Sequence, residues 1–118
     1  MSKWRPTTQK ELEVIIREQL AVCTPMQRET FGKYRVPMQR VVIQRYGKTE
    51  YVFVVAQRGQ EAMYYEDIEE GFNFSPLDAD GNILEHWCSQ DELKYALWHW
   101  MGRPQQYRAG PAEPIDTE

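Results

Sequence analysis

The residues that could do chemistry are most concentrated between positions 64 and 74, where the sequence reads YYEDIEEGFNF. This segment contains no basic side chain and four carboxylates, Glu66, Asp67, Glu69 and Glu70. Acid–base hydrolysis needs two carboxylates held at a fixed separation in unlike surroundings, so that their pKa values differ. No motif brackets these four, and the segment reads as a strand end and a loop. We therefore expect no catalytic pair here, and no enzyme.

Two other patterns could bind metal ions. The segment DADGNILE at 78–85 resembles the middle of a calcium-binding loop, but Pro76 and Trp87 stand where two essential oxygen ligands belong. A hairpin turn explains this segment better. Zinc could be held by two cysteines and two histidines whose spacings match no zinc signature, namely Cys23, His86, Cys88 and His99. We expect no metal and no cofactor.

Motifs for nucleophilic catalysis and phosphate binding are incomplete. Cys88 and His99 could act as a nucleophile and its base, but neither an orienting carboxylate nor an oxyanion loop accompanies them. The Gly-Lys-Thr triplet at 47–49 lacks the first glycine of a phosphate-binding loop and stands between two predicted strands. We interpret this triplet as part of a hairpin turn.

The charges of the chain are distributed unevenly. Residues 1–60 contain eleven lysines or arginines and five glutamates, whereas residues 61–92 contain ten aspartates or glutamates and neither lysine nor arginine. Residues 93–118 hold three of each sign, and the whole chain has a formal charge of −4. A strongly acidic segment repels itself unless cations face it. Those cations come either from the first half of the chain or from a partner.

The acidic segment also carries large aromatic rings, which are enriched in binding interfaces. Charge would guide its association with a basic protein partner, and the rings would supply adhesion. We therefore predict a non-catalytic protein-binding module, or an inhibitor or immunity-type protein. Its predicted partner-binding residues are Tyr64, Tyr65, Glu66, Asp67, Glu69, Glu70, Phe72 and Trp87. The alternative is a solvated edge whose carboxylates pair with Arg40, Arg45 and Arg58 of the chain itself.

Two other binding functions stay open. Single-stranded nucleic acid or a nucleotide could stack on strand aromatics beside these three arginines, the aromatics being Tyr51, Phe53, Tyr64 and Tyr65. The net charge of −4 argues against nucleic acid, because phosphate contacts supply most of that affinity. Self-association into a homodimer, through exposed rings or an edge strand, is the third hypothesis.

The first third of the chain is predicted to be helical. Thr8 opens a capping-box pattern, and apolar residues then recur at helical spacing, so we expect a helix over residues 8–22. Thr24 opens a second such pattern with a proline directly after it, which predicts a short helix over residues 25–33.

The middle of the chain is rich in β-branched and aromatic residues. Residues 39–46 and 50–57 flank a Gly-Lys turn signal and predict a hairpin. The second of these strands is apolar on both faces, so we expect it at the centre of a sheet. Residues 61–66 predict a third strand. Residues 71–77 and 82–87 predict a further hairpin around the turn DADG.

The last predicted helix follows Ser89 and Glu92, which form a third capping-box pattern. Its apolar face consists of Leu93, Ala96, Leu97, Trp100 and Met101. Gly102 predicts its end, and residues 103–118 read as a flexible tail rich in proline and glycine. Trp98 falls off the apolar face, so the sequence leaves its exposure open.

At 118 residues the chain fits one α+β domain, which we place at residues 1–102. The expected order is two helices, three to five antiparallel strands and a final helix, with the helices covering one face of the sheet. No apolar run is long enough to span a membrane, and the first residues lack the apolar stretch of a signal peptide. We therefore expect a cytoplasmic protein.

Overall fold

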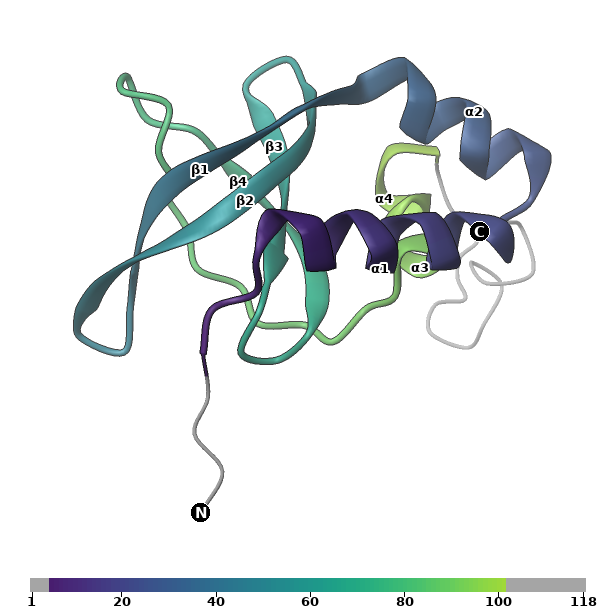
Figure 1. The fold of residues 1–118 in the computed structure, drawn as a ribbon. Helices are drawn as coiled ribbons and strands as arrows, with labels where there is room; N and C mark the ends of the chain where they lie inside the picture. The colour runs from purple at the N-terminus through teal and green to yellow at the C-terminus, as the bar shows by residue number, and fades with distance from the viewer. Residues whose placement is uncertain (1–4, 102–118) are drawn as a thin grey trace, which may run out of the picture.

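Two helices lead into a four-stranded antiparallel sheet, and two short helices follow it (Figure 1). The computed structural model describes residues 5–101. Its elements are α1 (Gln9–Ala21), α2 (Pro25–Tyr34), β1 (Arg35–Arg45), β2 (Lys48–Arg58), β3 (Glu61–Glu66), β4 (Gly71–Pro76), α3 (Leu93–Ala96) and α4 (Trp98–Met101). The predicted α+β fold is confirmed, with four strands in the described part of the chain. No helix within residues 5–101 is both long and apolar enough to cross a membrane.

Both N-terminal helices begin where their capping boxes predicted. The hydroxyl of Thr8 accepts a hydrogen bond from the Glu11 amide, and the Glu11 carboxylate accepts one from the Thr8 amide. Thr24 and Gln27 exchange the same pair of bonds at the start of α2. Each box satisfies amides that would otherwise lack a partner in the first turn.

The strands form a simple meander in the order β1-β2-β3-β4. The predicted first hairpin is confirmed, and its two-residue turn places both Tyr46 and Gly47 at positive φ. A turn of this kind matches the right-handed twist of the flanking strands. The hairpin therefore aligns β1 and β2 along most of their length, from Arg45 opposite Lys48 to Gln39 opposite Val54.

Apolar side chains cover both faces of the sheet. One face packs against the helices, and its buried cluster includes Leu12 and Phe31 from the helices and Tyr65 and Phe72 from the strands. The other face has a separate cluster that includes Tyr64. This second cluster is covered by the connection that follows β4, which contributes Ile83 and Leu77. The central position predicted for the second strand, apolar on both faces, is confirmed.

The connection after β4 also reaches the opposite edge of the sheet. The Ile83 amide donates to the Val42 carbonyl of β1 at 3.0 Å, and the Val42 amide donates to the Asn82 side chain at 2.9 Å. These bonds occupy part of the outer edge of β1, which would otherwise offer free backbone groups.

The predicted second hairpin is wrong beyond its turn. Gly81 has φ +82° as expected, but only a single bridge joins Leu77 to Ile83. The next backbone amides bond to side chains instead of to a strand. Both Leu84 and Glu85 donate to the hydroxyl of Ser75. Residues 84–92 are therefore an irregular segment shaped by side chains of the sheet.

The capping box predicted at Ser89 is also wrong. The N-cap of α3 is Glu92, and its side chain makes no capping bond. The amide of Leu93 instead donates to the side chain of Gln19, on α1, at 2.6 Å. The helix is short and splits into α3 and α4, although its predicted apolar face is largely buried. Gly102 and residues 103–118 lie outside the described residues.

Candidate functional site

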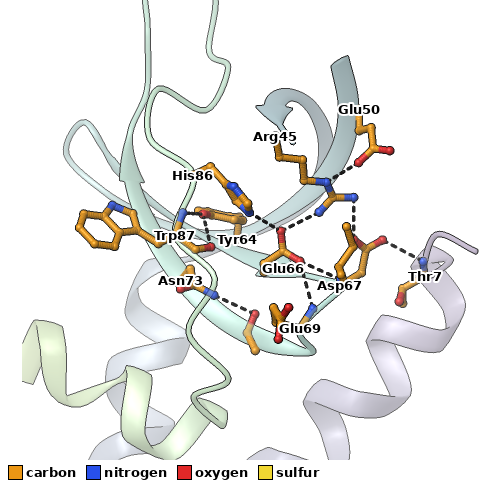
Figure 2. A network of polar contacts seen from close by, with 12 residues as sticks. Thr7, Arg45, Glu50, Tyr64, Glu66, Asp67, Glu69, Asn73, His86 and Trp87 are labelled. Carbon is orange, nitrogen blue, oxygen red and sulfur yellow. Dashed lines mark hydrogen bonds and ion pairs between the residues drawn. The ribbon is translucent and has the colours of Figure 1, made fainter. Parts of the chain in front are cut away.

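Arg45, the last residue of β1, is the centre of a buried charge network (Figure 2). Its guanidinium is fully buried and contacts three carboxylates: Glu50, Glu66 at 2.8 Å and Asp67 at 3.0 Å. Removing an ion from water costs several kcal/mol, and only close pairing offsets that cost. The acidic segment therefore receives an internal cation from the basic half of the chain.

Glu66 has its hydrogen-bonding capacity filled inside the protein. One oxygen accepts bonds from the amides of Ile68 and Glu69, and the other accepts from Arg45 and contacts the His86 ring at 2.8 Å. Burial alone would raise the pKa of Glu66, but the bonds from Arg45 and the two amides hold this pKa below its ordinary value. Glu66 is thus a structural carboxylate that fixes the β3–β4 turn.

Besides the bond from the Glu85 amide to Ser75, three polar anchors hold the irregular segment 85–90 against the sheet. The hydroxyl of Tyr64 accepts a bond from the Trp87 amide and donates to the Trp87 carbonyl at 2.9 Å. The side chain of Asn73 bonds to both the amide and the carbonyl of Ser89, each at 2.9 Å. The third anchor is the contact between His86 and Glu66.

Gly71 allows this segment to approach the sheet closely. A Cβ atom added at Gly71 would lie 2.2 Å from the Ser89 carbonyl oxygen and 2.6 Å from the Cα atom of Gln90. No side chain fits at such distances, so only glycine permits this contact.

The eight predicted partner-binding residues do not share one surface. Five of them are at most 7% exposed: Tyr64, Tyr65, Glu66, Asp67 and Phe72. Their rings fill the two apolar clusters, and the two carboxylates pair with Arg45. Trp87 is 58% exposed, but its indole points away from the network (Figure 2). Glu69 and Glu70 are the predicted carboxylates that remain accessible.

These two glutamates open onto a groove between α1 and the β3–β4 turn, with a volume of about 880 Å³. We call it the acidic groove. Among residues 5–101, four carboxylates and one guanidinium line it, with a formal charge of −3, and they belong to Glu11, Glu69, Glu70, Glu92 and Arg5. Between them lie the apolar side chains of Val14, Ile15 and Tyr65. The sequence pattern did not point to the contribution from α1.

The carboxylates of the acidic groove differ in their pairing. Glu11 is bound to Arg5 at 2.6 Å, and the bond from Arg5 lowers the pKa of Glu11 to about 2. Glu92 lies 4.0 Å from the ammonium group of Lys94. The Glu69 carboxylate accepts a neutral hydrogen bond from the Gln90 amide group at 3.1 Å. Within residues 5–101, no cation forms an ion pair with Glu69 or Glu70.

The candidate metal ligands are separated. Cys23 is buried in the helical core and Cys88 is exposed. His86 contacts Glu66, whereas His99 contacts Glu61 at 2.7 Å. No group of three or more potential ligands among residues 5–101 is arranged to hold a metal ion.

The residues of the predicted stacking platform do not lie on one face of the sheet. Tyr65 and Phe53 pack with the helix-facing cluster, but Tyr64 belongs to the cluster on the other face. Arg45 is paired with carboxylates in the buried network. Arg40 is exposed, and its guanidinium carbon lies 4.9 Å from the centroid of the Tyr51 ring.

No protein-family model, curated protein or solved structure matches this chain. The function must therefore be argued from the site itself.

Proposed function

We propose that this chain is a non-catalytic binding protein that engages a basic segment of a protein partner through the acidic groove. The observation that carries the proposal is the pair Glu69 and Glu70, which face this groove without a cation from the described part of the chain. The buried network supports it indirectly, because Arg45 neutralises the inner carboxylates and leaves the outer two for a partner.

The lining of the groove suits lysine and arginine side chains. Both have an aliphatic stem that packs on apolar surface and a charged end that stays near carboxylates or water. Val14 and Ile15 offer the apolar surface, and Glu69 and Glu70 offer the carboxylates. A basic partner would be attracted from a distance by the same charges, which chiefly speeds association.

The backbone at Glu70 adds a second argument. Glu70 has φ +62°, a left-handed conformation that costs a residue with a side chain about 1–2 kcal/mol. Glycine would adopt it freely and occupies three other left-handed positions, Gly47, Gly59 and Gly81, whereas Tyr46 in the first hairpin turn is the second non-glycine residue with positive φ among residues 5–101. Because the side chain of Glu70 is retained at this backbone cost, we infer that its carboxylate serves binding.

The proposal is tested by capture followed by zero-length cross-linking. A carbodiimide couples an activated carboxylate directly to a lysine amine and adds no spacer, so the two groups must come into contact. We expect captured proteins to be joined through Glu69 or Glu70, and we expect capture to weaken as salt rises.

A charge-matched control separates the groove from the net charge of the protein. The double variant Glu69→Gln/Glu70→Gln should reduce both capture and cross-linking, whereas Glu18→Gln/Glu29→Gln, which changes two exposed carboxylates on α1 and α2, should not. Cross-links confined to other carboxylates, or equal loss in both double variants, would contradict the proposal.

A further inference from the structure

A second cavity, of about 450 Å³, adjoins the segment that precedes α1 and shares Thr7 and Tyr65 with the acidic groove. It is lined by Thr8 at the start of that helix and by side chains of the first hairpin and β3, among them Arg40, Thr49, Tyr51, Phe53 and Tyr65. We call it the aromatic cavity. Its volume is within the range of small-molecule sites.

Aromatic rings and the Arg40 guanidinium define the chemistry of the aromatic cavity. Tyr51 is 51% exposed and Phe53 is half-buried, so both offer ring surface to a ligand. Arg45 also lines the cavity, but it is paired with Glu50 and Asp67, and these three groups together carry a formal charge of −1 that Arg40 brings to zero. Arg40 forms no ion pair with a carboxylate of residues 5–101, and its guanidinium is held 4.9 Å above the Tyr51 ring centroid.

We propose that the aromatic cavity binds a small planar aromatic molecule that carries one anionic group. The ring would lie against Tyr51 and Phe53, and the anionic group would accept hydrogen bonds from Arg40, whose planar fork suits phosphates and carboxylates. The hydroxyls of Thr8 and Thr49 add polar groups to the same wall. This site goes beyond the proposed protein-binding function and does not depend on it.

Two natural ligand sources share this chemistry, a nucleoside monophosphate and an aromatic carboxylate. Calorimetric titration of the full chain with AMP and with indole-3-acetate distinguishes them, because the tighter binder identifies the source. Adenosine lacks the phosphate of AMP, and ribose 5-phosphate lacks its base. If AMP is the ligand, both compounds should bind at least about tenfold more weakly than AMP.

Variants of exposed residues test the assignment without disturbing the core. Arg40→Gln should weaken binding of the tighter anion about tenfold and remove most of its salt dependence. Tyr51→Ala should weaken the same ligand about tenfold through lost stacking. Arg17→Gln and Tyr95→Ala change exposed residues of the same types elsewhere and should leave binding unchanged.

Two results would overturn this proposal. One is the absence of saturable binding of either anion up to about 1 mM, which is a weak affinity for a small ligand. The other is binding that Arg40→Gln and Tyr51→Ala leave unchanged. The double variant Glu69→Gln/Glu70→Gln should bind the anion normally, so failure of the acidic groove and failure of the aromatic cavity give different results.

Discussion

Burial of the Arg45 guanidinium is tolerated only because three carboxylates surround it. The carboxylates in turn depend on Arg45, since Glu66 has no access to water. Removing Arg45 would leave Glu66 and Asp67 buried without this cation, whereas removing Glu66 would leave Arg45 with Glu50 and Asp67 alone. Single substitutions in this network should therefore change the stability of the protein strongly.

Replacing Arg45 with methionine should lower the free energy of unfolding by about 3–5 kcal/mol, because Glu66 and Asp67 would be left buried without their cation. Chemical denaturation measures this change. The control Arg40→Met removes an exposed guanidinium and should change stability by no more than about 0.5 kcal/mol. Equal effects of both variants would show that the network contributes little.

The pH dependence of stability should reveal the lowered pKa of Glu66. The folded pKa lies below the ordinary value of 4.5, so the unfolded chain takes up the proton first as the pH falls. The stabilisation is therefore fully present above about pH 4.5 and is lost as the pH falls through the folded pKa. Thermal unfolding of the protein and of Glu66→Gln should differ most near neutrality and converge in acid. A constant difference between pH 7 and pH 3 would contradict this assignment.

At the scale of elements, Gly71 determines how closely the segment 85–90 packs against the sheet. Gly71→Ala should lower the free energy of unfolding by about 2–3 kcal/mol, because the new methyl group would meet the Ser89 carbonyl at 2.2 Å. Gly32→Ala is the matched control, since Gly32 lies in α2 with open space around it. This change should be neutral or stabilising by up to about 1 kcal/mol. Similar destabilisation by both would contradict the close approach.

The β3–β4 turn should show a conflict between stability and binding at Glu70. Glu70→Gly removes the side chain that makes the left-handed backbone conformation unfavourable. The change should raise the free energy of unfolding by about 1 kcal/mol. The same change removes a carboxylate from the acidic groove and should weaken capture of a basic partner. Denaturation and capture are measured on the same preparation, and a variant that captures normally would separate Glu70 from binding.

Helices and strands whose ends are fixed by residues close in the sequence could be predicted. Thr8 and Thr24 cap their helices through residues only three positions away, and the first hairpin is set by its two-residue turn. The helix start at Glu92 could not be predicted, because its cap is supplied by Gln19 from a distant part of the chain. For the same reason, residues 82–87 read as a strand, although the amides of Leu84, Glu85 and Trp87 bond to side chains of the sheet.

At the scale of the whole molecule, the uneven charge of the sequence is partly cancelled by the fold. The carboxylates at the end of β3 meet Arg45 from the end of β1, and these two strands run in the same direction in the meander. Their ends therefore lie at the same end of the sheet, a proximity that strand order could have indicated. The sequence did not show which carboxylates would stay accessible, because that depends on how α1 lies against the turn.

Binding of a basic segment at the acidic groove can be measured by titration with a short lysine- and arginine-rich peptide. The peptide is added to the protein and to two charge-matched double variants, Glu69→Gln/Glu70→Gln and Glu18→Gln/Glu29→Gln. We predict that the first variant binds about tenfold more weakly than the protein, while the second binds within about twofold of it. Equal weakening in both variants would mean that only net charge attracts the peptide, and it would contradict the account.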